Sequence, residues 1–112
     1  MEIVDKKENG ILYLMLKGKI MGGPEAESFR EILYEAIKED LVKVVVDMSE
    51  ASWMNSSGLG MLIGGLTTLR SSGGDMILVG VNERTRRPLE ITRLDAVFQM
   101  FDSKQEAIHS FK

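Results

Sequence analysis

The feature that most constrains this 112-residue chain is a β-branched run followed by a polar loop and then a helical pattern. Residues 42–46 read Val-Lys-Val-Val-Val, which is typical of a strand buried on both faces of a sheet. From residue 59 onward, leucine and isoleucine recur at helical spacing. The loop between them therefore joins the end of a central strand to the start of a helix.

Three polar residues, Asn55, Ser56 and Ser57, stand where this helix is expected to begin. Their short side chains can accept hydrogen bonds from the unpaired backbone N–H groups of a first helical turn. The same N–H groups and the positive end of the helix dipole attract an anion, so a hydroxyl here could carry a phosphate. Helix caps far outnumber phosphorylation sites, so on these residues alone simple capping is the better-supported interpretation.

Strand and helix patterns alternate along the rest of the chain. We expect strands at residues 2–6, 11–16, 42–48, 76–81 and 96–100, the first two joined by an Asn-Gly turn. We expect helices from Pro24 to about residue 39, from about 57 to 71, over 84–94 and over 104–111. This order predicts an α/β fold, with one domain over 1–112, a mostly parallel mixed sheet of four to five strands and about four helices.

Parallel strands open their carboxyl ends at one edge of a sheet, which should bring three loops of this chain together. The loops concerned are residues 21–24, 49–57 and 81–84. Met21, Met54, Ser56 and Arg84 are therefore expected on one surface, where methionines suit contact with a partner. Packing at the base of a loop is the ordinary alternative for the methionines, and Trp53 is expected to be such a core anchor.

Composition and missing motifs argue against several functional classes. The chain has no cysteine and a single histidine, so neither a thiolate metal site nor a Ser-His-Asp hydrolase is expected. Phosphate-loop and dinucleotide-binding fingerprints are absent. The net charge of −3 argues against nucleic-acid binding, and no apolar run approaches the roughly 20 residues of a membrane span. We expect a cytoplasmic protein without catalytic activity, metal or cofactor.

The segment Asn55-Ser56-Ser57-Gly58-Leu59-Gly60 resembles the D-S-S-G-L-G signature of the STAS domain, specifically of the anti-sigma factor antagonist family. Asn55 stands where that family usually has Asp. Leu16-Lys17-Gly18-Lys19-Ile20 is similar to the family's L-x-G-x-L, and Thr92-Arg93-Leu94 resembles its T-G-L, with Arg93 replacing Gly. The resemblance covers nearly the whole chain.

This resemblance implies a phosphorylation-switched interaction module. An unphosphorylated member binds an anti-sigma factor that is also a serine kinase of the histidine-kinase-like ATPase type, which frees the sigma factor and so regulates transcription. Phosphate on the first serine of the motif, here Ser56, ends that interaction. The expected partner contacts around it are Met21, Met54, Asn55, Ser57 and Arg84.

Two departures from the family pattern leave a second hypothesis open. Asn55 lacks the carboxylate of the usual Asp, and Met21 stands where many members have an acidic residue after G-x-L. If the kinase recognises its substrates through those two carboxylates, its recognition of this chain is altered. The second hypothesis is a constitutive STAS-type module that senses a small ligand or holds an assembly together without phosphorylation.

Overall fold

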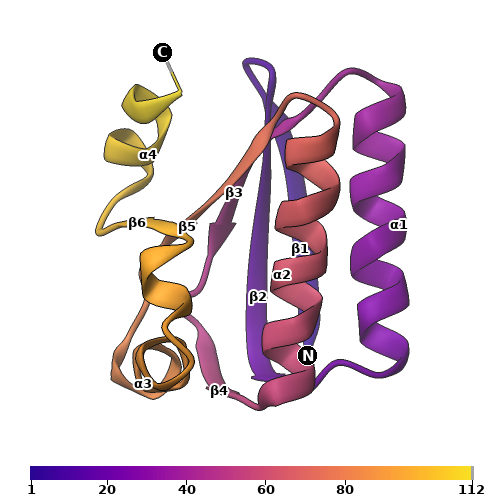
Figure 1. The fold of residues 1–112 in the computed structure, drawn as a ribbon. Helices are drawn as coiled ribbons and strands as arrows, with labels where there is room; N and C mark the ends of the chain where they lie inside the picture. The colour runs from indigo at the N-terminus through magenta and orange to yellow at the C-terminus, as the bar shows by residue number, and fades with distance from the viewer. Residues whose placement is uncertain (112) are drawn as a thin grey trace.

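A six-stranded mixed sheet forms the centre of the computed structural model, which describes residues 1–111 (Figure 1). The strands are β1 (Glu2–Glu8), β2 (Ile11–Ile20), β3 (Lys43–Asp47), β4 (Ala51–Met54), β5 (Asp75–Val79) and β6 (Gln99–Phe101). The order is β1-β2-β3-β5-β6, with β4 paired to the end of β2, and only the β1–β2 pair is antiparallel. The expected mostly parallel mixed sheet is confirmed, with one strand more than predicted.

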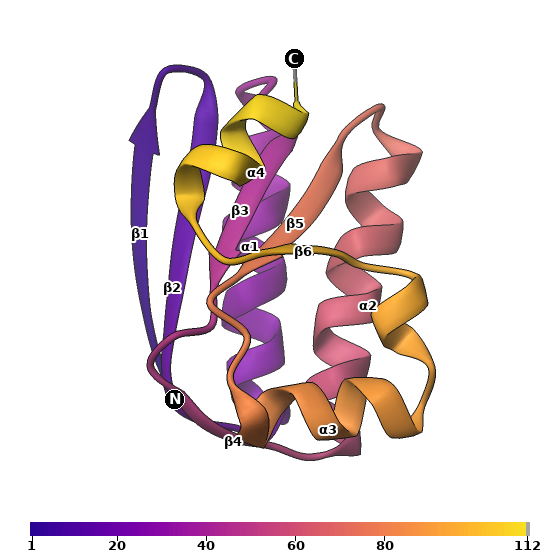
Figure 2. The ribbon, with the colours of Figure 1, turned by 90° about the vertical axis from the view of Figure 1, so that its left-hand side faces the viewer.

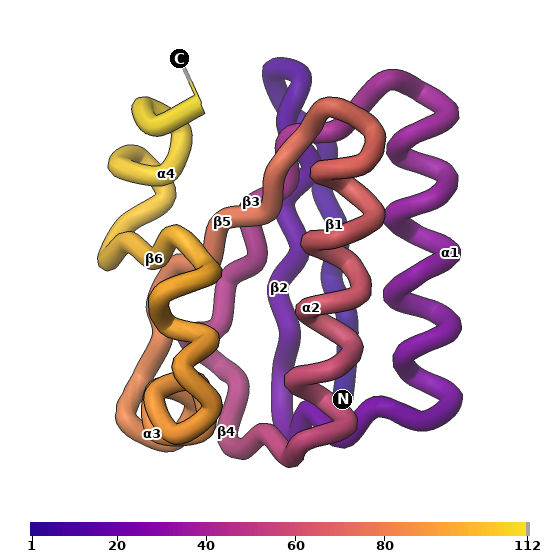
Figure 3. Tube along the Cα trace, viewed as in Figure 1, coloured from indigo at the N-terminus to yellow at the C-terminus, as the bar shows by residue number. Residues whose placement is uncertain are grey.

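Four helices pack around this sheet, as expected. They are α1 (Pro24–Lys38), α2 (Ser56–Ser71), α3 (Glu83–Ile91) and α4 (Lys104–Ser110), with a 3-10 turn, η1 (Leu94–Ala96), after α3. α1 and α2 lie side by side on one face of the sheet, and α4 lies on the other (Figures 1 and 2). The end of β2, strand β4, the start of α2 and α3 all gather at the lower end of the trace in Figure 3.

The main hydrophobic core lies between the sheet and the pair α1–α2. Alternate side chains of β2, β3 and β5 enter it and are fully buried: Leu12, Leu14, Leu16, Val44, Val46, Met76 and Leu78. Phe29 from α1 and Leu62 from α2 are among the helix side chains that pack against them. A smaller cluster around Val45 and Ile77 lies on the opposite face, under α4. Both faces of β3 are therefore covered, which explains its unbroken valines.

The start of α2 is fixed against the end of β2 by two contacts with the Ile20 carbonyl oxygen. The backbone N–H of Asn55 donates a hydrogen bond to that oxygen over 3.2 Å. Gly58 lies so close to the same oxygen that a Cβ atom at this position would overlap with it. The glycine of the motif is therefore required by packing.

Two expectations about the loop at 49–57 are wrong because residues 51–54 form strand β4. Successive side chains of a strand point to opposite sides. Met54 consequently points into the core and is 2% exposed, whereas Trp53, which we expected in the core, is 45% exposed. The expected partner contact at Met54 is corrected accordingly, because a side chain this deeply buried cannot meet a partner directly.

Other boundaries move by a few residues. β2 continues through Gly18, whose φ of 88° coincides with a shift in the register of the β2–β4 pairing. α3 begins at Glu83 and ends at Ile91 rather than spanning 84–94, and Pro88 lies inside it. The last strand is Gln99–Phe101 rather than 96–100. No helix among the described residues combines the length and apolar composition needed to cross a membrane.

We predict that Gly58→Ala destabilises the domain by about 1–3 kcal/mol, because the added methyl group has no space against Ile20. Gly60→Ala is the matched control in the same helix. A Cβ at Gly60 meets open space, so alanine there should stabilise by roughly 0.8–1 kcal/mol. Urea unfolding of both variants measures the difference, and equal stabilities would contradict the packing described here.

We predict opposite outcomes for two glutamate substitutions. Met54→Glu should lower the free energy of unfolding by more than about 3 kcal/mol, because it places a carboxylate in the core. Met21→Glu should change it by less than about 0.5 kcal/mol, because Met21 is 47% exposed. Thermal unfolding followed by circular dichroism tests both. A well-folded Met54→Glu variant would show that β4 is misplaced.

Candidate functional site

The candidate site is the surface around the start of α2, which we call the α2 edge. It consists of Met21 from the β2–α1 loop, Trp53 from β4, and Asn55, Ser56 and Ser57 at the start of α2. All except Asn55 are exposed, and Asn55 is half-buried. The two exposed apolar side chains, Met21 and Trp53, flank a group of neutral polar residues.

Asn55 alone caps α2. Its side-chain Oδ1 accepts a hydrogen bond from the Gly58 N–H at 2.8 Å, and its own backbone is extended, with φ −102° and ψ −178°. Among the described residues, neither the Ser56 nor the Ser57 hydroxyl takes part in a hydrogen bond. Capping therefore accounts for Asn55 but leaves both serine hydroxyls available.

The positive end of the α2 helix dipole also lacks a compensating negative charge. No acidic residue occupies that turn, and within residues 1–111 the backbone N–H groups of Ser56 and Ser57 have no acceptor. Unpaired N–H groups and the helix dipole both favour an anion at this place. Ser56, the first residue of the helix, carries its exposed hydroxyl at this end.

The β2–α1 loop borders the same residues, as the sequence predicted. Gly22, with φ 76°, packs against Ser57 so tightly that a Cβ on Gly22 would lie 2.9 Å from the Ser57 Cβ. Met21 precedes this contact in the chain and is exposed beside it. Of the four residues expected on one surface, Met21 and Ser56 lie at the same edge of the sheet, whereas Met54 is buried.

Arg84 lies farther round this edge. It lines a shallow depression together with residues 49–52, Asn82 and Glu83, and Ser56 is not part of that lining. The structure records no hydrogen bond or ion pair between Arg84 and the start of α2. Its expected contact with a phosphate on Ser56 therefore lacks direct geometric support.

Asn82 is a positioning residue that the sequence analysis missed. Its Nδ2 donates to the Ala51 carbonyl oxygen at 2.9 Å, and its Oδ1 accepts from the Arg84 and Thr85 N–H groups at 2.9 and 3.3 Å. One side chain thus holds β4 against the start of α3. The sequence signal was Asn82-x-x-Thr85, a reciprocal capping pair at the start of a helix.

Neither a histidine nor a metal-binding cluster accompanies Ser56 within residues 1–111. The single histidine, His109, lies in α4, which covers the face of the sheet opposite α2, so no histidine stands beside Ser56. Within residues 1–111, no cluster of three or more histidine, cysteine, aspartate or glutamate side chains could hold a metal ion.

The groups with shifted pKa values lie in the β1–β2 hairpin and not at the α2 edge. Hydrogen bonding to Glu39 raises the pKa of the Lys7 ammonium group. The Lys6–Glu8 hydrogen bond raises the pKa of Lys6 and lowers that of Glu8. Burial raises the pKa of Tyr13. The lysine and glutamate shifts arise from exposed surface pairs, which contribute little to stability and suggest no catalytic role.

Comparison with known proteins identifies this architecture. The STAS domain model matches residues 2–107. The crystal structure of a protein from Thermotoga maritima, assigned as an anti-sigma factor antagonist, superposes with a TM-score of 0.86 at 25% identity, covering 96% of this chain and 92% of the other. The anti-sigma-B factor antagonist of Listeria monocytogenes is 34% identical over 64 residues, which is 57% of this chain and 55% of that protein.

A third comparison concerns the fold alone. The Bacillus cell fate determinant SpoIIAA, solved in its phosphorylated form, has a TM-score of 0.76 at 21% identity and covers 99% of this chain and 100% of its own. The chain therefore belongs to the STAS domain family, among the relatives of the anti-sigma factor antagonists.

Proposed function

We propose that this protein is an anti-sigma factor antagonist whose α2 edge is switched by phosphorylation of Ser56. The observation that carries the proposal is the division of roles at the start of α2. Asn55 supplies the cap, and the Ser56 hydroxyl is exposed and unbonded within the described chain. A kinase can therefore reach that hydroxyl without first breaking a structural hydrogen bond.

In the unphosphorylated form, the α2 edge suits a neutral, partly apolar contact. Trp53 and Met21 supply large adaptable side chains, and aromatic and methionine residues are enriched in protein interfaces. The proposed partner is an anti-sigma factor that is also a serine kinase of the histidine-kinase-like ATPase type. Regulation of transcription then proceeds in the cytoplasm through this protein contact, without nucleic acid or membrane.

Phosphate on Ser56 would end this contact locally. It adds about −1.5 to −2 charges at pH 7, which an apolar interface cannot bury without a matching cation. On the free domain, the phosphate meets unpaired N–H groups and the helix dipole, a favourable interaction of about 0.3–1 kcal/mol. The phosphorylated SpoIIAA structure shares the fold, which agrees with a switch that leaves the domain folded.

Asn55 changes the electrostatics of the switch but not its geometry. It caps α2 through a side-chain oxygen, as the family's usual Asp would, yet carries no charge beside the phosphate. Because Asn replaces Asp, this position also lacks the carboxylate that a kinase could recognise. A constitutive STAS-type module without phosphorylation therefore remains the competing function, and the phosphorylation experiment separates the two.

We predict a single phosphate, on Ser56, when the protein is incubated with ATP and the histidine-kinase-like serine kinase from the same genome. Peptide mapping by mass spectrometry locates it. Ser56→Ala should abolish modification, whereas Ser57→Ala, a matched change at the next exposed hydroxyl, should retain it. Phosphate on Ser57 or Ser52 would overturn the site, and stable binding without modification would establish the constitutive module.

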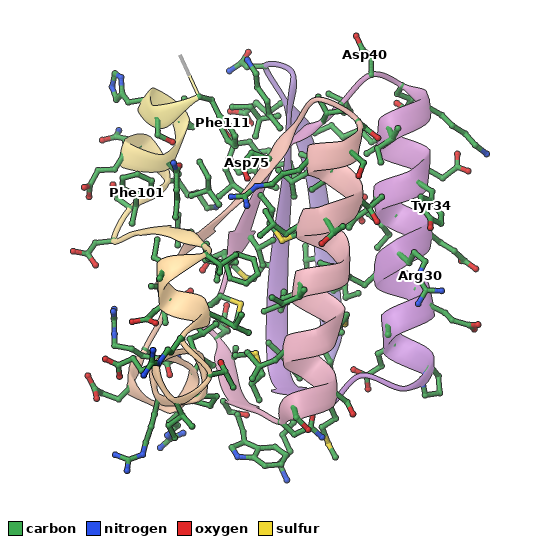
Figure 4. All side chains as sticks on the ribbon, in the orientation of Figure 1. Arg30, Tyr34, Asp40, Asp75, Phe101 and Phe111 are labelled. Atoms are coloured by element: carbon green, nitrogen blue, oxygen red, sulfur yellow. The ribbon has the colours of Figure 1, made fainter. Side chains whose placement is uncertain are left out.

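We predict that Trp53→Ala lowers affinity for the same kinase by about 2 kcal/mol, roughly thirtyfold, because exposed aromatic anchors dominate interfaces. Tyr34→Ala is the control, since Tyr34 is similarly exposed, 48% against 45%, but lies on α1 (Figure 4). Titration calorimetry measures both affinities, and circular dichroism confirms folding. The sole tryptophan also makes its fluorescence a direct reporter of binding. Equal affinities would place the interface elsewhere.

A further inference from the structure

Strand β4, which carries Trp53, is held from two sides. On one side it pairs with the end of β2, and this pairing has an irregularity between Gly18 and Lys19. On its other side lies α3 (Figures 2 and 3). Within residues 1–111, the Trp53 indole N–H donates no hydrogen bond of its own. The position of Trp53 therefore depends on what holds the backbone of β4.

A side-chain amide holds the side of β4 that faces α3. The Asn82 Nδ2 donates to the Ala51 carbonyl oxygen at 2.9 Å and to the Met48 carbonyl oxygen at 3.4 Å. Met48 also accepts the Ala51 N–H at 3.0 Å, so both carbonyls belong to the turn that leads into β4. Ala51 is 2% exposed, and a buried carbonyl that loses its donor destabilises the segment around it.

The other end of the same amide fixes its orientation. The Asn82 Oδ1 accepts from the backbone N–H groups of Arg84 and Thr85 at the start of α3. Two donors thus face the oxygen and two carbonyl acceptors face the nitrogen, which only one orientation of an amide satisfies. A carboxylate has the same shape but no N–H, so it would satisfy the α3 side and repel the β4 side. This position therefore requires an amide and not merely a helix cap.

We infer that Asn82 is a positioning residue for the partner contact at Trp53. Its amide sets where β4 runs, and so where the Trp53 ring stands, without being one of the five residues of the α2 edge. The start of α3 thereby contributes to partner binding through one side chain. This inference rests on the proposed function, because it assigns to Asn82 an effect on affinity for the proposed kinase partner.

The first test uses the free domain and the variant Asn82→Asp. This variant keeps the oxygen that caps α3 but lacks the donor to Ala51, so the amides of residues 51–54 should exchange at least about tenfold faster. The fluorescence anisotropy of Trp53, the sole tryptophan, should fall. Thr85→Val is the matched control. It removes the hydroxyl that accepts the Asn82 backbone N–H at the same helix start, and should leave both readouts of β4 unchanged.

The second test is a double-mutant cycle on affinity for the histidine-kinase-like serine kinase, measured by titration calorimetry. Asn82→Asp alone should weaken binding by about tenfold, less than the roughly thirtyfold loss expected for Trp53→Ala. In the Trp53→Ala background, the same change should alter affinity by less than about twofold, because a residue that acts through Trp53 has nothing left to position. A merely structural role would produce the same loss in both backgrounds.

Asn82→Ser is the second variant, because serine also caps helices but is too short to keep the contact with Ala51. Circular dichroism checks that each variant is folded. Unchanged exchange at residues 51–54, unchanged anisotropy, or additive losses in the cycle would overturn the inference. A wild-type protein that does not bind the kinase would overturn the proposed function, and the free-domain measurements would then still decide whether Asn82 positions Trp53.

Discussion

The docking of α2 against the end of β2 is the constraint on which the α2 edge depends. The Ile20 carbonyl oxygen accepts the Asn55 N–H, and the same oxygen leaves no room for a side chain at Gly58. The helix can approach this closely only with glycine in its first turn. This approach sets where Ser56 emerges, and it fixes the β2–α1 loop against Ser57 through Gly22.

A helix start held in this way makes a local switch physically reasonable. The backbone of the first turn is tied to the sheet, so a charge added at Ser56 meets groups that are already in place. The unpaired N–H groups would receive a phosphate placed there, and no acidic residue of that turn would oppose it. The added charge would change what a partner meets, because the five residues of the α2 edge are otherwise uncharged and partly apolar.

Much of this architecture could be predicted from the sequence because the signals are strong and local. The valine run identified the central strand, and the polar triplet located the start of α2. Strand β4 was missed because four residues are too few to show an alternating pattern. Its pairing depends on residues of β2 that lie 33 to 34 positions earlier in the chain. Without that strand, Trp53 was expected in the core and Met54 at the surface, which is the reverse of the structure. In a strand, adjacent side chains point to opposite faces, and this geometry decides which of the two is buried.

The residues of the α2 edge are uncharged and present large side chains, which favours slow dissociation through buried contacts. A phosphate on Ser56 would disrupt such a contact directly, because it would add about −1.5 to −2 charges at pH 7 at a place from which a bound partner excludes water.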